Sequence, residues 1–283
     1  MALFSLLVAI LVERLKVLSP TLQLDRLLDK YHGSLFGDTQ LKSPLMMIIA
    51  LVFPAVVISV LGWVISGLFW GLLSLSLWVL VAVLCFNHQH QRQAFKRYVQ
   101  AACRNDAQAC YHYAQELEPC QNFDAISGAD LGCKVGQSVA WTNYRYYGAV
   151  TIFFIVFGPV GSVLYCTVRY YAEINTRDEK NWPLVEKLLF ILDWLPSRIF
   201  SFGYVLCGEF KRAIDVWRQL AIHPFISARE IIVQTAMAAE PLACPTTENI
   251  SLDPTIAMLA LSKRNFSLIV AALSLLTIFG MVS

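Results

Sequence analysis

An acid, a proline and a base lie within six residues of one another in the otherwise apolar stretch Leu188–Cys207 (LLFILDWLPSRIFSFGYVLC). They are Asp193, Pro196 and Arg198. Five positions correspond to about 140° around a straight helix, so the two charges would not be neighbours. Pro196 is expected to bend or break the helix, which would either bring the charges together or free backbone carbonyls for Arg198. An ionisable group at membrane depth faces a partner or a wet cavity, so we expect a structural ion pair or a ligand site.

Polar side chains also border the apolar stretch Tyr146–Tyr171. Asn143 and Arg145 precede it in TNYRYY, and Arg169 lies near its end. Such residues either anchor a helix at lipid headgroups or contribute to a ligand site. The residues predicted to shape the helices around such a site are Gly158, Pro159, Gly161, Trp194 and Pro196.

A charged cluster, RND, lies outside the apolar stretches and contains Arg104 and Asp106. On its own it is interpreted as a solvated helix face, although both residues are kept as ligand-binding candidates. The sequence has no GxxxxGK[ST], GxGxxG, HExxH or GxSxG motif, so no familiar catalytic signature is present. The histidines form no ligand set, and His88 and His90 are interpreted as interfacial polar residues. No metal site and no cofactor are predicted.

The composition of the chain indicates whether these polar groups lie in water or in a membrane. Hydrophobic residues make up 57% of the 283-residue chain and charged residues 15%, which is too apolar for an ordinary soluble domain. The apolar runs lack the alternation of a barrel, so they must be helices. The sequence therefore predicts an all-α, multi-pass membrane protein with four to five transmembrane helices, kinked helices and cytoplasmic amphipathic helices. The predicted spans are residues 44–66, 68–86, 146–168, 188–207 and 266–282.

The positive residues favour five crossings. Eleven Lys and Arg residues lie in 13–43 and 87–145, which a hairpin of the first two spans would place together in the cytoplasm. Four crossings is the alternative. In that topology residues 188–207 would not cross, and the other eleven Lys and Arg residues would lie outside, against the usual excess of positive charge in the cytoplasm. Met1–Val12 is interpreted as an interfacial or re-entrant helix. The scattered cysteines include no CxxC motif and suggest a reducing compartment for Arg92–Arg145.

The whole chain, residues 1–283, is interpreted as one integral membrane domain with cytoplasmic helical segments at 87–145 and 208–265. Gln91–Glu118 is predicted to be a single amphipathic helix. The glycines between Pro119 and Gly136 predict a loop, and Lys211–Glu240 is predicted to be helical with an interruption at Pro224.

An ordered set of short motifs resembles the AmpE family of bacterial inner-membrane proteins. The motifs, in order along the chain, are Glu13–Leu15 (ERL), Gln23–Asp25 (QLD), Ala102–Asp106 (ACRND), Asn143–Tyr147 (NYRYY), Gly158–Val160 (GPV) and Leu192–Arg198 (LDWLPSR). The resemblance covers essentially the whole chain. It implies a role in signalling linked to β-lactamase induction and peptidoglycan recycling.

That family is in turn similar to the CbiB membrane synthases of cobalamin assembly. The synthase pattern N-W-I-P-A-R falls on DWLPSR, where Trp194, Pro196 and Arg198 match and Asp193 replaces an Asn. Elsewhere acids are lost, and Arg169 stands where an Asn is expected. Those acids are the groups that ATP-dependent amide synthesis would need. The resemblance therefore implies a synthase-like scaffold without its original chemistry.

The sequence leaves two functions open. The first is a non-catalytic regulatory or sensory protein of the inner membrane that binds a cell-wall fragment (muropeptide) or a nucleotide. The alternative is an active ATP- and Mg²⁺-dependent synthase-like enzyme of altered specificity. A transporter is disfavoured by the few spans and the lack of a repeat. The lipid bilayer is the expected partner, nucleic acid is not expected, and homo-oligomerisation is left open.

Overall fold

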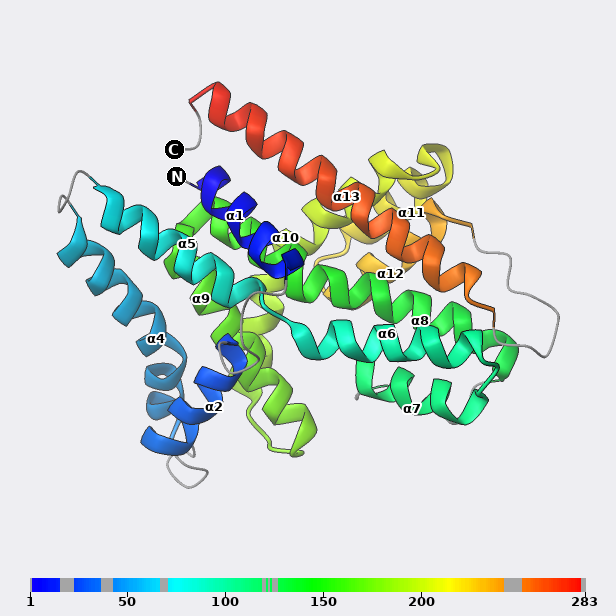
Figure 1. The fold of residues 1–283 in the computed structure, drawn as a ribbon, viewed down its shortest axis with the longest axis horizontal. Coiled ribbons are helices and arrows are strands. Elements are labelled where there is room, and N and C mark those ends of the chain that lie inside the picture. The colour runs from blue at the N-terminus through cyan, green and yellow to red at the C-terminus, as the bar shows by residue number, and fades with distance from the viewer. Residues whose placement is uncertain are drawn as a thin grey trace. The chain divides into compact units, whose positions relative to one another are not determined.

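The computed structural model describes residues 2–15, 23–36, 43–66, 71–118, 121, 123, 127–241 and 251–280. Within these ranges the chain is helical and contains no strand, as predicted (Figure 1). In the part of the chain that the structure describes, five helical stretches are long and apolar enough to cross a membrane, which confirms the predicted class of multi-pass helical membrane protein. The number of crossings stays a prediction.

The helices group into two compact units. The first unit comprises Met1–His88, Val150–Leu192 and Ala272–Ser283, and the second comprises Gln89–Ala149 and Asp193–Ala271. Three helical stretches of the chain pass from one unit into the other, so the units are interleaved in sequence rather than consecutive.

The first unit contains the most apolar helices. Its elements are α1 (Ala2–Leu15), α2 (Leu24–Leu35), α4 (Pro44–Ile65), α5 (Leu72–Phe86), most of α9 (Ala149–Arg177) and the beginning of α10 (Pro183–Cys207). Helix α1 packs along α5. Among the described helices of this unit only α2 is strongly amphipathic, with Leu24 and Leu28 buried and its charged residues along other faces.

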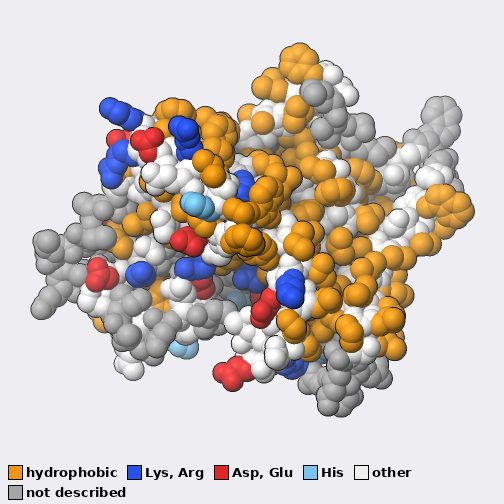
Figure 2. Space-filling model, turned by 180° about the vertical axis from the view of Figure 1, so that it is seen from behind, with side chains coloured by type: hydrophobic (Ala, Val, Ile, Leu, Met, Phe, Trp, Pro, Cys, Tyr) orange, Lys and Arg blue, Asp and Glu red, His pale blue; other side chains and the backbone are white. Residues whose placement is uncertain are grey.

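Helix α4 exposes apolar side chains around most of its circumference. Trp63 is 79% exposed and Leu45 64%, whereas Ala50 and Leu51 are buried. Figure 2 shows hydrophobic side chains in broad continuous areas of the surface. A soluble protein would not expose so much apolar surface, so we infer that this surface of the protein faces lipid.

Helix α9 is interrupted where the sequence predicts a kink. Gly158 has φ +66°, a left-handed conformation that glycine adopts without a Cβ clash, and Pro159 follows it. A Cβ on Gly158 would lie 3.0 Å from the ring of Trp78 on α5, so the glycine also permits close packing.

The second unit contains α6 (Gln89–Cys103), α7 (Ala107–Leu117), α8 (Gly128–Asn143), the π-helical turn η2 (Tyr144–Gly148), α11 (Phe210–Ile222) and α12 (Ala228–Ala239). The later part of α10 and most of α13 (Asp253–Ile278) complete it. The interruption predicted at Pro224 is confirmed by the turn between α11 and α12.

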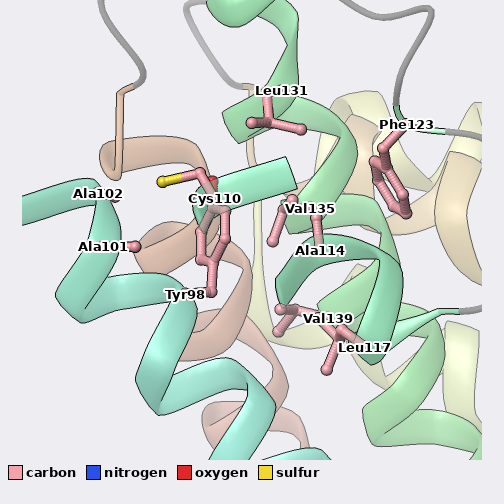
Figure 3. Packing of buried hydrophobic residues seen from close by; sticks show 10 residues of the cluster. All are labelled: Tyr98, Ala101, Ala102, Cys110, Ala114, Leu117, Phe123, Leu131, Val135 and Val139. Carbon is pink, nitrogen blue, oxygen red and sulfur yellow. The ribbon is translucent and has the colours of Figure 1, made fainter. Parts of the chain in front are cut away.

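The prediction of one helix over Gln91–Glu118 is wrong, because the RND cluster forms a turn between α6 and α7. Asn105 has φ +55°, and the Asp106 side chain accepts a hydrogen bond from the backbone N–H of Ala109, which caps α7. The two helices then fold against each other and against α8. Their core is shown in Figure 3 and contains Tyr98, Ala101, Ala102, Cys110, Ala114, Leu117, Phe123, Leu131, Val135 and Val139.

The predicted loop up to Gly136 is also wrong in its second half, since α8 begins at Gly128. Ser127 caps α8 by accepting a hydrogen bond from the N–H of Asp130. Gly132 is needed for packing, because a Cβ there would lie 2.1 Å from the carbonyl oxygen of Ser251. A glycine that allows close approach was therefore mistaken for a loop signal.

The cysteine argument for a reducing compartment fails at one position. Cys133 is disulfide-bonded. The described cysteines that are free are Cys85, Cys103, Cys110, Cys166 and Cys207. The placement of residues 87–145 in the cytoplasm therefore rests on the positive charges alone.

Candidate functional site

The π-helical turn η2 brings a tyrosine to the acid of the LDWLPSR motif. Tyr144 is fully buried, and its hydroxyl donates to the Asp193 carboxylate over 2.7 Å. Four residues later, a Cβ on Gly148 would lie 2.4 Å from the ring of Phe200, so only glycine fits where η2 meets α10. Single π-helical turns are frequent at functional sites, and this one aims a hydroxyl at a buried carboxylate.

Asp193 is only 4% exposed. A buried carboxylate needs hydrogen-bond donors to remain charged, and Tyr144 supplies one of them. The Asp193 side chain therefore faces η2, between α8 and α9, and belongs to the packing of the second unit.

Arg198 is used differently, as a cap for α11. Its Nη2 donates to the carbonyl of His223 over 2.8 Å, and its Nε donates to the carbonyl of Ala221 over 3.3 Å. Its Nη1 donates to the carbonyl of Trp194 over 2.7 Å. The last carbonyls of a helix lack intrahelical partners and carry partial negative charge, so a cation there satisfies both needs.

Trp194 strengthens this contact. Its indole N–H donates to the carbonyl of Pro224 over 3.2 Å, and the Arg198 guanidinium lies 4.3 Å from the centre of its ring. Farther along, the Trp217 indole N–H donates to the hydroxyl of Ser201 over 3.1 Å. Helix α11 thus folds back along the second half of α10 and is fixed at its C-terminal end by the Trp-Pro-Arg frame.

Pro196 does not break α10, which continues to Cys207. The expected break is therefore absent, and although Arg198 donates to backbone carbonyls, they are not carbonyls that a break at Pro196 would free. The carbonyls come mainly from α11 rather than from the residues before the proline, because the guanidinium points toward the end of that helix.

Asn143 and Arg145 have local partners. The Asn143 amide donates to the carbonyl of Val139 over 2.8 Å, one turn earlier in α8. The Arg145 guanidinium lies 5.7 Å from the ring centre of Trp141, whose ring in turn lies 5.5 Å from that of Tyr144. Trp141 thus contacts both the Arg145 guanidinium and the ring of Tyr144.

Arg169 belongs to the first unit and forms a second polar cluster there. It is fully buried on α9, and its Nη2 donates to the Asp25 carboxylate over 2.9 Å. Its Nε lies 3.5 Å from Glu173. His88, at the start of the connection to α6, is also buried, and its Nδ1 lies 3.6 Å from Asp25. His88 is thus buried and paired within the protein, and its position at the membrane interface stays a prediction.

The environment of Asp25 keeps this carboxylate ionised. Burial alone would raise its pKa, but the charge of Arg169 and hydrogen bonding from His88 and Arg169 hold the pKa well below its usual range. Asp25 was not among the predicted site residues. It lies in the QLD motif, so the family motif was the available signal, but a charge on a surface helix could not reveal its buried partner.

Arg104 and Asp106 line a shallow pocket beside the turn between α6 and α7. The pocket is open to solvent and has a volume of about 120 Å³, and its lining residues are Arg97, Gln100, Ala101, Arg104, Asp106, Ala109 and Tyr113. Asp106 is already engaged as the cap of α7. Among the described residues, no group of His, Cys, Asp and Glu side chains could hold a metal ion.

Comparison with known proteins relates the entire chain to one family. The family described as "Regulatory signalling modulator protein AmpE" matches residues 1–283. A curated protein named "Protein AmpE", from Shigella flexneri, is 26% identical over 297 residues, covering 99% of this chain and 99% of that protein. No solved structure matches the chain.

Proposed function

The chain belongs to the AmpE family of regulatory signalling modulators, and from this premise we propose that it is a non-catalytic regulatory or sensory protein of the bacterial inner membrane. In this proposal it acts in signalling linked to β-lactamase induction and peptidoglycan recycling. Its scaffold is that of a synthase whose chemistry has been lost, and its ligand is a cell-wall fragment or a nucleotide.

The use made of Arg198 is the observation that carries the proposal. A synthase would need a guanidinium that can reach phosphate or carboxylate groups of its substrates. Here all three guanidinium nitrogens donate to backbone carbonyls, and the side chain caps α11. The Trp-Pro-Arg frame thus supports helix packing, and substrate binding at Arg198 would require breaking that packing.

The groups that remain for ligand recognition are the Tyr144–Asp193 pair with Arg145, and the polar cluster around Arg169. The first contains the buried acid Asp193, and in the second the buried Arg169 pairs with the partly exposed Asp25. Such clusters can bind a ligand and change helix packing when they do so, which is what a sensor requires.

Two assays test the proposal. Deletion of the gene should alter β-lactamase induction, and complementation with the Asp193→Asn variant should restore the wild-type response less well than the Asp215→Asn variant, which changes an exposed acid on α11. Purified protein should not turn over ATP in the presence of Mg²⁺. An unchanged induction in the deletion strain would contradict the regulatory role, and ATP turnover that Asp193→Asn abolishes would support the enzyme instead.

A further inference from the structure

We propose that α2 covers an anion-binding site on α9, and that its own acids Asp25 and Asp29 occupy this site in place of a ligand. The site consists of Arg169, His88 and Tyr170. The ligand would carry two anionic groups and would displace α2 when it binds. The site follows from the contacts of the first unit; only the signalling consequence of releasing α2 depends on the proposed function.

The first half of the site holds the Asp25 carboxylate. Its Oδ1 accepts from Arg169 over 2.9 Å, and its Oδ2 lies 3.6 Å from the Nδ1 atom of His88. Arg169 and His88 are both buried, whereas the Asp25 side chain is 26% exposed. The positive side of the contact is therefore built into the unit, and the negative side reaches it from the surface.

The second half holds Asp29, one helical turn later on α2. Its Oδ1 accepts a short hydrogen bond from the hydroxyl of Tyr170, the residue after Arg169. Arg177 adds positive charge near the Asp29 carboxylate. The two acids of α2 thus meet successive donors on α9, which fixes the spacing of the two anionic subsites.

The other contacts of α2 are a few buried apolar side chains, the stacking of Tyr31 on Phe53 of α4 and the ring contact of His32 with Tyr171 of α9. Of its apolar side chains only Leu24 and Leu28 are buried, while Leu27 and Leu35 are exposed. The Tyr31 hydroxyl adds one hydrogen bond, to a carbonyl of α4. An interface held by charge-assisted hydrogen bonds can be competed for by another anion, whereas one held by apolar burial cannot.

The spacing defines the class of ligand. Residues four apart on a helix have Cβ atoms about 6 Å apart. A diphosphate or a short dicarboxylate presents two anionic groups within this distance of each other, and both groups suit arginine and tyrosine donors. A single phosphate would fill only one subsite and should compete less well.

Release of α2 can be measured by trypsin, because Arg26 and Lys30 are exposed on this helix. Cleavage inside a helix requires local opening, so its rate reports undocking. In the full-length protein in nanodiscs, the double variant Asp25→Asn/Asp29→Asn should be cleaved at these positions about tenfold faster than wild type or more. The matched control, Glu209→Gln/Asp215→Asn, removes two exposed acids of the second unit and should be cleaved at the wild-type rate.

The anion site is tested by adding inorganic pyrophosphate or succinate to the wild-type protein, with sodium chloride at matched ionic strength as reference. Either dianion should accelerate cleavage in α2, and neither should accelerate it further in the double variant. Tyr170→Phe, which removes one donor and keeps the ring, should be cleaved at an intermediate rate and provides a second readout if the double variant does not fold.

Equal cleavage of wild type and double variant would show that the acids do not hold α2. Acceleration by the dianions no greater than by chloride would show that the site does not bind them. Either result overturns the inference. Neither depends on β-lactamase induction, so failure here is separable from failure of the proposed function.

Discussion

Replacing Arg198 by alanine should loosen the C-terminal end of α11. The substitution removes the donors that now satisfy the carbonyls of Ala221 and His223. It also removes a positive charge from the negative end of the helix dipole and the cation that stacks on Trp194.

The magnitude follows from these contacts. A hydrogen bond from a charged group contributes about 1.5–3 kcal/mol net, and a cation at a helix C-terminus adds about 0.3–1 kcal/mol. His223 and Pro224 are exposed, so water can replace part of what is lost. We therefore expect a net loss of about 2–3 kcal/mol, which corresponds to about 100-fold faster amide exchange where exchange occurs by local opening.

Hydrogen–deuterium exchange of the purified protein, followed in peptides covering the end of α11, measures this loss. Arg198→Lys should lie between wild type and Arg198→Ala, because an ammonium keeps the charge but cannot reach all the carbonyls. The control is Arg212→Ala on the same helix. The Arg212 side chain is 57% exposed and its Nη1 lies 3.5 Å from Glu209, so exchange should change by about twofold at most.

If Arg198→Ala exchanges no faster than Arg212→Ala, Arg198 does not cap α11. Its guanidinium would then be available to a ligand, and the main support for a non-catalytic protein would be lost.

Three further predictions concern other contacts. Gly203→Ala should destabilise the protein, because its Cβ would lie 1.9 Å from an asparagine oxygen of α13, whereas Gly33→Ala on α2 meets open space and should stabilise that helix by about 0.5–1 kcal/mol in thermal unfolding. Arg229→Ala should lower the free energy of unfolding by about 2–4 kcal/mol, because it leaves the 8%-exposed Glu118 without its bidentate partner, and Arg229→Lys should restore part of the loss. Equal melting temperatures for the alanine variant and the wild type would contradict the contact. Because the folded-state pKa of Asp25 is depressed, its contribution to α2 docking should be complete above the ordinary value of 3.8 and lost only as the pH falls further; acid-resistant protease cleavage assays that show release already above pH 5 would refute this.

The sequence could predict the class of fold because lipid imposes one simple requirement. Long apolar runs must be helical to satisfy their backbone, so the helices at 44–65, 183–207 and 253–278 follow from composition and length. The kink at Gly158 could be predicted as well, because the proline after it removes a backbone hydrogen-bond donor from the helix and glycine adopts conformations that interrupt a helix.

The structure of the polar segments was harder to predict from the sequence, because it depends on residues that are distant in the chain. The RND cluster could equally have been a helix face, and its role as a turn follows from Asp106 capping α7 while α6 and α7 share a core. The sequence suggested a loop at Gly132, whereas the structure shows a helix in which this glycine lets Ser251 pack closely against α8.

The candidate site shows the same division. The sequence by itself determined that Asp193, Arg198 and Arg169 are charges in apolar surroundings, because the cost of burying a charge depends only on its type and setting. Only the tertiary structure decided their partners: Tyr144 for Asp193, the end of α11 for Arg198 and Asp25 for Arg169. The last pair is separated by 144 positions. Hydrogen bonds and ion pairs act over a few ångströms, so their partners are fixed by how the helices pack and not by spacing along the chain.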